Sequence, residues 1–189
     1  MPQARTLTPR ELKRVLEYNS AFERHHQRNR VMLLLTHWCG MRVGEVAALR
    51  VTDVLAESGT VLSRIELQPH QTKNSRARTV FVSRKMAREL AAYITTLSEQ
   101  TRAGYLFRTQ KQSHFSANSA AQLLNRIYAR AGITGATSHS GRRSFITQLA
   151  SKGVGVRVLA ELAGHQSITT TQRYIDVNEE TVRAAVELL

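Results

Sequence analysis

Residues 139–174 read HSGRRSFITQLASKGVGVRVLAELAGHQSITTTQRY. Apolar residues recur here at helical spacing, which predicts helices over about 139–152 and 156–163 and a short one over 171–174. Gly164 suits the end of the second helix, so His165 begins a loop, and Tyr174 follows nine residues later. Two histidines, an arginine and a tyrosine at these positions, in a chain of formal net charge +13, point to chemistry on DNA phosphate.

The composition agrees with a folded, DNA-associated protein. The chain has 189 residues, 42% of them hydrophobic, which suits one domain with a substantial core. Lys and Arg number 27 against 14 Asp and Glu, and the isoelectric point is near 11.0. Such a surface favours a polyanion, and nucleic acid is the favoured partner over an anionic membrane.

Targeting and redox signals point to the cytoplasm. No apolar run approaches the roughly 18 residues of a membrane span, and the N-terminus lacks the apolar core of a signal peptide. Cys39 is the single cysteine, so an internal disulfide is excluded and a reducing compartment fits best.

The chain alternates between helical and strand-like texture. Thr8-Pro9-Arg10-Glu11 predicts a helix start with a capping box, and Ser83 and Ser116 precede further helical patterns. Further helices are expected over about 28–39, 43–49 and 179–189. Strands are expected around 61–67 and 79–82, joined by the polar, basic hairpin 71–76. The sequence therefore predicts an α+β fold, mainly α-helical, with one small antiparallel sheet of about three strands.

Arg42 and Glu45 lie three residues apart among apolar neighbours, so both face the same side of a helix start. Glu45 can hold Arg42 while the guanidinium fork stays free for two phosphate oxygens. A simple structural ion pair is the alternative interpretation.

His139 and Arg142 repeat this spacing at a second helix start, where backbone N–H groups favour an anion. The alternative is a capping histidine beside a surface arginine. Lys73, on the predicted hairpin, is either a solvated or DNA-backbone lysine or a mobile proton donor. His165 and Tyr174 taken singly are more typical of surface, core or rim positions than of catalysis.

Taken together and in order, these residues resemble the catalytic domain of the tyrosine recombinase, or phage-type integrase, family. The resemblance covers nearly the whole chain from about Leu7. It rests on four stretches: residues 40–49 (GMRVGEVAAL), Thr72-Lys73, residues 139–143 (HSGRR), and residues 162–165 (LAGH) through 171–174 (TQRY).

The resemblance implies a site-specific DNA recombinase that breaks and rejoins DNA through a covalent 3′-phosphotyrosine. Tyr174 is implied as the nucleophile, Lys73 as the general acid, His139 as the base and His165 as a further donor to the phosphate. Arg42 and Arg142 are implied to clamp the phosphate, with Glu45 supporting the site. A phenol has a pKa of about 10 in water, so the nucleophile needs a base and a cationic setting.

We also expect DNA contacts from several basic residues: Arg76, Arg78, Arg143 and Arg173. No carboxylate cluster for a metal and no Gly-rich phosphate loop is evident, so neither metal, ATP nor another cofactor is expected. The expected partner is double-stranded DNA, bound as a tetramer on two DNA sites, while the free domain can be monomeric.

Two departures from the family pattern are visible. Few residues precede Leu7, so we expect a catalytic domain over 1–189 with a leader or linker at 1–7 and no N-terminal DNA-gripping domain. Gly141 stands where many members have a bulkier apolar residue. The predicted helix at 179–189 either packs on its own domain or docks on a neighbouring protomer.

Two rival functions are left open. A type IB topoisomerase-like activity shares the tyrosine chemistry, although the short chain and the spacing from His165 to Tyr174 favour a recombinase. A non-catalytic DNA-binding regulator would suit the charge, but it gives no reason for the complete set of implied catalytic residues.

Overall fold

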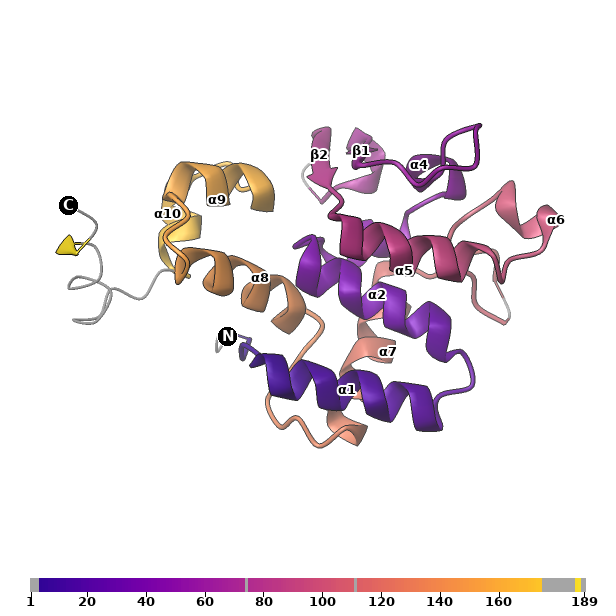
Figure 1. The fold of residues 1–189 in the computed structure, drawn as a ribbon, viewed down its shortest axis with the longest axis horizontal. Coiled ribbons are helices and arrows are strands. Elements are labelled where there is room, and N and C mark those ends of the chain that lie inside the picture. Colours follow the sequence, from indigo (N-terminus) through magenta and orange to yellow (C-terminus); the bar gives the residue numbers. More distant parts are fainter. Residues whose placement is uncertain (1–3, 74, 111, 175–185, 188–189) are drawn as a thin grey trace.

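The computed structural model describes residues 4–73, 75–110, 112–174 and 186–187. Its elements follow in chain order: α1 (Pro9–Phe22), α2 (His26–Trp38), α3 (Val43–Ala47), α4 (Val51–Val54), β1 (Arg64–Leu67), the 3-10 turn η1 (Pro69–Gln71), β2 (Arg78–Phe81), α5 (Arg84–Ile94), α6 (Glu99–Arg102), α7 (Ala117–Arg130), α8 (Ser140–Ala150), α9 (Val156–Ala163) and α10 (Ile168–Gln172). The predicted mainly helical α+β fold is confirmed (Figure 1).

Helix α1 begins as its sequence predicts. The Thr8 side chain accepts a hydrogen bond from the Glu11 backbone N–H, and the Thr8 backbone N–H donates to Glu11 Oε2 at 2.9 Å. This reciprocal capping box, with Pro9 in the first turn, satisfies backbone donors that a helix start leaves without partners. Ser116 caps α7 as predicted, and Ser83 caps α5 in the same way, both without the reciprocal bond.

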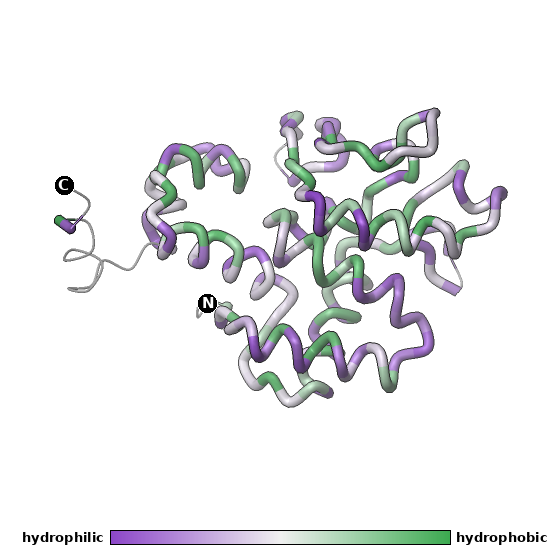
Figure 2. Tube along the Cα trace, viewed as in Figure 1, coloured by the Kyte–Doolittle hydropathy of each residue, from purple (hydrophilic) through white to green (hydrophobic). Residues whose placement is uncertain are grey.

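Helix α2 forms the centre of the core. Five consecutive residues, 31–35, are almost completely buried, which is typical of a helix surrounded by others. It packs against α1, α5 and α8, and in Figure 1 it lies between α1 and α5. Figure 2 shows hydrophobic segments where these helices meet and a hydrophilic stretch at the α1–α2 turn. Cys39, just after α2, is buried, and burial raises the pKa of its thiol to about 12.

The sheet is smaller than predicted. Within the described residues it has two antiparallel strands, with Ile65 opposite Val80 in the β1–β2 register, rather than about three. Val61 was expected to begin the first strand, but it forms an isolated bridge with Leu55 instead. The connection between the strands is also more than a simple hairpin, because η1 precedes the turn that contains Lys73.

The last three helices form one end of the molecule. Helix α8 packs against α2, α9 packs against α8 and approaches β2, and α10 packs on α9 (Figure 1). The short helix predicted over 171–174 lies earlier, at Ile168–Gln172, so Tyr174 follows it in a turn. Of the helix predicted at 179–189, only residues 186 and 187 are among those described.

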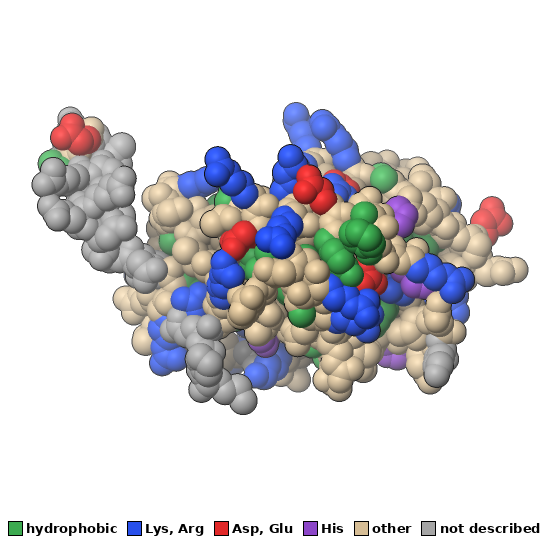
Figure 3. Space-filling model, turned by 90° about the horizontal axis from the view of Figure 1, so that it is seen from below, with side chains coloured by type: hydrophobic (Ala, Val, Ile, Leu, Met, Phe, Trp, Pro, Cys, Tyr) green, Lys and Arg blue, Asp and Glu red, His purple; other side chains and the backbone are tan. Residues whose placement is uncertain are grey.

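The surface carries the expected excess of basic side chains. Figure 3 shows Lys and Arg spread over one face with few Asp and Glu among them. In the described part of the chain, no helix combines the length and apolar character that crossing a membrane needs.

Candidate active site

Glu45 is the anchor of the candidate site. This carboxylate, in the first turn of α3, is 1% exposed and binds two arginines. Arg42 donates to Glu45 Oε1 at 2.9 Å from its side chain and to Oε2 at 2.8 Å from its backbone N–H. Arg78, at the start of β2, donates to both oxygens at 3.2 and 2.7 Å. Burial would raise the pKa of Glu45, but the hydrogen bonds and charges of Arg78 and Arg42 hold it below its usual value.

Arg142 completes a cluster of guanidinium groups. Its residue is 5% exposed, and its side chain donates to the carbonyl of Gly40 at 2.7 Å and to that of Ala163. Burial, with the neighbouring charges of Arg42 and Arg78, lowers the pKa of Arg142 to about 9, so it stays protonated at neutral pH. Its own hydrogen bonds reach neutral carbonyls only. We call Arg42, Arg78, Arg142 and Glu45 the arginine cluster.

The arginine cluster carries surplus positive charge. Arg42 and Arg78 pair with Glu45, whereas Arg142 binds two neutral carbonyls, so three positive charges less one negative leave two in this cluster. A cavity of about 240 Å³ opens beside it, lined in part by Arg42, Arg76 and His165. An anion that entered here would relieve the repulsion among the arginines, and phosphate fits a guanidinium fork well.

His139 and Lys73 lie near the same cluster. His139 is the N-cap residue of α8, three residues before Arg142. The pKa of His139 is lowered, first by partial desolvation of the ring and then by the charges of Arg142, Lys73 and Arg42. Lys73 is exposed in its turn and close enough to oppose protonation of His139. A neutral imidazole at this position can accept a proton.

His165 and Tyr174 face each other across the end of α9. Their rings are stacked, with centroids 5.7 Å apart, and Arg143 places its guanidinium carbon 5.5 Å from the Tyr174 ring centroid. Nδ1 of His165 shares a hydrogen bond of 2.9 Å with the hydroxyl of Thr171, which is fully buried. Burial, with the charges of Arg142, Arg42 and Arg78, lowers the pKa of His165 to about 4, so this ring is neutral at pH 7.

Two glycines bring α8 against the site. A Cβ atom on Gly141 would lie 2.1 Å from Thr36 Oγ1, so glycine permits the close packing of α8 on α2. Gly40 has a φ of +63°, and a Cβ there would overlap the ring of Phe145. The departure at Gly141 therefore has a packing reason: it lets α8 approach the helix whose end leads into Arg42.

The structure brings the predicted catalytic residues into one region, but Arg78 is not where the sequence prediction put it. A DNA contact was expected of Arg78, and the structure places its side chain 10% exposed and bound to Glu45. Strand β2 turns its first residue inward, toward α3 and α9. Arg76 and Arg173 are exposed, in agreement with a surface role. Thr171 was missed, and its spacing from His165 gave no signal.

Within the described residues, no three His, Cys, Asp or Glu side chains are arranged to hold a metal ion, and the expectation of no metal stays a prediction.

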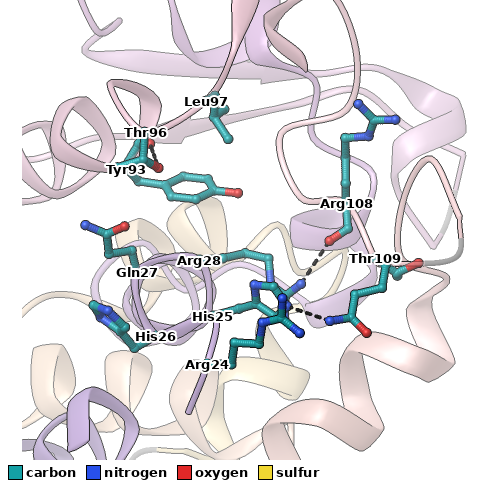
Figure 4. A pocket seen from close by; sticks show the side chains of 11 residues that line it. Arg24, His25, His26, Gln27, Arg28, Tyr93, Thr96, Leu97, Arg108 and Thr109 are labelled. Atoms are coloured by element: carbon teal, nitrogen blue, oxygen red, sulfur yellow. Dashed lines mark hydrogen bonds between the residues drawn. The ribbon is translucent and has the colours of Figure 1, made fainter. Parts of the chain in front are cut away.

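A second arginine-rich cavity, of about 370 Å³, lies at the start of α2 and includes none of the predicted catalytic residues. We call it the far pocket. Figure 4 shows Arg24, His25 and Arg28 gathered there, with a hydrogen bond from Arg28 to the carbonyl of Arg108.

Comparison with known proteins identifies the family. A family model described as the phage integrase family matches residues 5–181, and the chain therefore belongs to that family. Among curated proteins, the tyrosine recombinase XerA of Thermococcus kodakarensis is 33% identical over 190 residues, which cover 99% of this chain and 62% of that protein. The chain spans about 60% of the length of the first curated relatives that it matches.

Solved structures agree on the fold. A crystal structure of XerA recombinase matches with a TM-score of 0.77 at 26% identity, covering 100% of this chain and 65% of that one. The integrase of transposon Tn1549, in complex with circular intermediate DNA, matches with a TM-score of 0.74 over 99% of this chain and 67% of the other. At 19% identity this second likeness shows the fold alone. The predicted resemblance to tyrosine recombinase catalytic domains is confirmed.

Proposed function

We propose that this chain is the catalytic part of a site-specific DNA recombinase that breaks and rejoins DNA through a 3′-phosphotyrosine. The observation that carries the proposal is the arginine cluster, whose cavity is lined in part by His165 and whose charges act on His139 and Tyr174. Membership of the phage integrase family and the names of the curated relatives support the same class of reaction.

In the proposed reaction, the phenolic oxygen of Tyr174 attacks the phosphorus of the scissile phosphodiester. A bond forms between this oxygen and phosphorus, and the bond from phosphorus to the 5′-oxygen breaks. Arg42 and Arg142 hold the two non-bridging oxygens and stabilise the charge that develops on them in the transition state. The phosphotyrosine preserves the phosphoester, so the 5′-hydroxyl of another strand can attack it and release Tyr174.

The proton transfers are assigned to three side chains. His139, kept neutral by its surroundings, accepts the proton of the Tyr174 hydroxyl. Lys73 gives a proton to the departing 5′-oxygen, which its exposed position in a turn permits. His165 donates to the phosphate: when Nδ1 accepts the Thr171 hydroxyl proton, its N–H lies on Nε2.

The proposed partner is double-stranded DNA in the cytoplasm. The Tn1549 integrase in its solved structure is bound to DNA, and the net charge of +13 here suits the same partner. We assign further DNA contacts to Arg76, Arg143 and Arg173. We also propose a tetramer on two DNA sites.

A suicide substrate, nicked near the cleavage site so that the reaction cannot reverse, tests the proposal. The wild-type protein should form a covalent adduct with the DNA, and Tyr174→Phe should bind the same DNA and form none. Wild-type protein that binds its site yet never yields an adduct would refute catalysis and leave a DNA-binding regulator. Adducts accompanied by relaxation of supercoiled plasmid, without exchange between two sites, would indicate a topoisomerase-like activity instead.

A further inference from the structure

The end of α9 is held by three arginines from three other parts of the chain. Each of its last carbonyls accepts a hydrogen bond from a different one: Leu162 from Arg78 at 3.0 Å, Ala163 from Arg142, and Gly164 from Arg42 at 3.3 Å. Carbonyls in the last turn of a helix have no partner within the helix and carry its partial negative charge. The arginine cluster therefore also fixes the end of α9, from which His165 projects.

Arg78 differs from Arg42 and Arg142 in how many of its guanidinium nitrogens form hydrogen bonds within the protein. All three nitrogen atoms of its guanidinium are engaged: Nε and Nη2 with Glu45 and Nη1 with the carbonyl of Leu162. Arg142 is buried as well, at 5% exposed, so the engagement of all three nitrogens, and not burial, sets Arg78 apart. A guanidinium with all three nitrogens engaged in this way is badly placed to bind a DNA phosphate, but well placed to hold α3 and α9 together.

Gly164 shows that the Arg78 side chain is a packed part of this region. Gly164 ends α9 with a φ of +60°, a conformation that favours glycine. A Cβ atom on Gly164 would lie 2.5 Å from Cδ of Arg78 and 3.2 Å from its Nε. The loop that presents His165 therefore rests directly on the aliphatic part of Arg78.

We propose that Arg78 is a positioning residue for DNA cleavage. Through Glu45 it orients Arg42, and through Leu162 it fixes the end of α9 and so the place of His165. The proposal rests on the proposed function, since it assigns Arg78 a part in the same reaction. It replaces the DNA contact that the sequence suggested for this residue.

Single-turnover cleavage of the suicide substrate, at DNA concentrations that saturate the protein, separates positioning from DNA contact. For Arg78→Ala we expect DNA affinity and its salt dependence as in the wild type, with cleavage slowed about 100-fold because the phosphate-binding groups are misplaced. Arg64→Ala is the matched control: Arg64 is exposed on β1, the partner strand of β2, and its loss should change neither quantity.

Two further measurements exclude a merely structural effect. Guanidinium ion, added at a non-denaturing concentration, should partly restore cleavage by Arg78→Ala, whereas sodium chloride at the same ionic strength should not. Arg78→Lys should bind DNA normally but cleave slowly, because an ammonium cannot bridge both oxygens of Glu45 and the Leu162 carbonyl. If Arg78→Ala fails to fold, as its thermal unfolding would reveal, Arg78→Lys alone decides the matter.

The possible results have separate meanings. Weaker DNA binding with a smaller salt dependence, and a wild-type rate at saturation, would make Arg78 a DNA contact and overturn the inference. If both Arg78→Lys and Arg78→Ala cleave DNA at the wild-type rate, the inference is overturned as well. Where Arg78→Ala does not fold, a wild-type cleavage rate in Arg78→Lys alone overturns it. Failure of the wild-type protein to form any adduct would instead refute the proposed function.

Discussion

The two arginine-rich regions of this molecule lie at opposite ends of α2, and they are built differently. Helix α2 has 13 residues, so about 20 Å separates its ends. In the arginine cluster, backbone carbonyls bind all three guanidinium groups, and the buried Glu45 carboxylate binds two of them. In the far pocket, Arg28 is held by the Asn29 side chain and the Arg108 carbonyl, but Arg24 and Arg108 are exposed, and none of the described residues that line the pocket is Asp or Glu.

This difference shows what net charge can and cannot do. Exposed arginines attract a polyanion from solution, but their side chains are free to move and their charge is screened by salt. Guanidinium groups held by a buried network offer donors in fixed directions, which is the property that transition-state stabilisation needs. We therefore expect chemistry to depend on the arginine cluster and only general DNA attraction to depend on the far pocket.

The largest effect is expected from Arg142→Ala. The variant should still bind DNA, but cleavage at saturating DNA should slow about 1000-fold, because a charged donor to the developing charge is lost. Single-turnover cleavage of the suicide substrate measures the rate, and a filter-binding or fluorescence titration measures the affinity. A loss below tenfold would show that a fixed guanidinium matters less than the comparison of the two regions implies.

A histidine in each region allows a second test, through pH. The pKa of His139 is lowered by partial desolvation, Arg142, Lys73 and Arg42, and that of His25 by burial, Arg28 and Arg24. A base works when neutral, so kcat/KM for cleavage should hold as pH falls through about 6.5 and decline only below it. His139→Ala should remove this decline and slow the reaction about 100-fold.

His25→Ala serves as the control for that measurement, because it alters a histidine of similar surroundings in the far pocket. Its pH profile should match that of the wild type. If instead His25→Ala shifted the acid limb while His139→Ala left it in place, the assignment of His139 as the base would be wrong.

The smallest effect is expected from the double variant Arg24→Ala with Arg108→Ala. Exposed charges contribute little individually, so single-turnover cleavage should stay within about twofold of the wild type. DNA affinity at low salt should fall slightly, since two cations are lost. A tenfold loss of cleavage in this variant would place the far pocket in the reaction and remove the distinction drawn above.

The sequence predicted those parts of the fold that depend on neighbours in the chain. The capping box at Thr8, the buried run in α2 and the glycine that ends α9 are local signals, and all are present. One strand boundary was missed, because composition alone does not show which partner a strand-like residue pairs with. Val61 has the composition of a strand, but its partner is Leu55, on the far side of a tight turn, rather than β2.

In the site, too, a contact between neighbours in the chain was predicted and a contact between distant residues was not. Arg42 and Glu45 could be paired from sequence because they are three residues apart. Arg78 binds the same carboxylate from 33 residues away, and no local pattern shows that the first residue of β2 points inward. A basic hairpin ordinarily suggests solvent or DNA, which explains why a DNA contact and not a bond to Glu45 was predicted for Arg78. The hydrogen bond between Thr171 and His165 was not predicted either, because it forms only when α10 packs on α9.

The hydrogen bonds from Arg42 and Arg142 to backbone carbonyls have a consequence for conformational entropy. An arginine side chain carries about 2 kcal/mol of rotamer entropy, which is lost wherever the side chain becomes fixed. Here folding already restricts both side chains, through Glu45 and Gly164 for Arg42 and through Gly40 and Ala163 for Arg142. A phosphate that binds here meets donors that are already ordered. The rotamer entropy of these two side chains is therefore lost during folding and not during DNA binding.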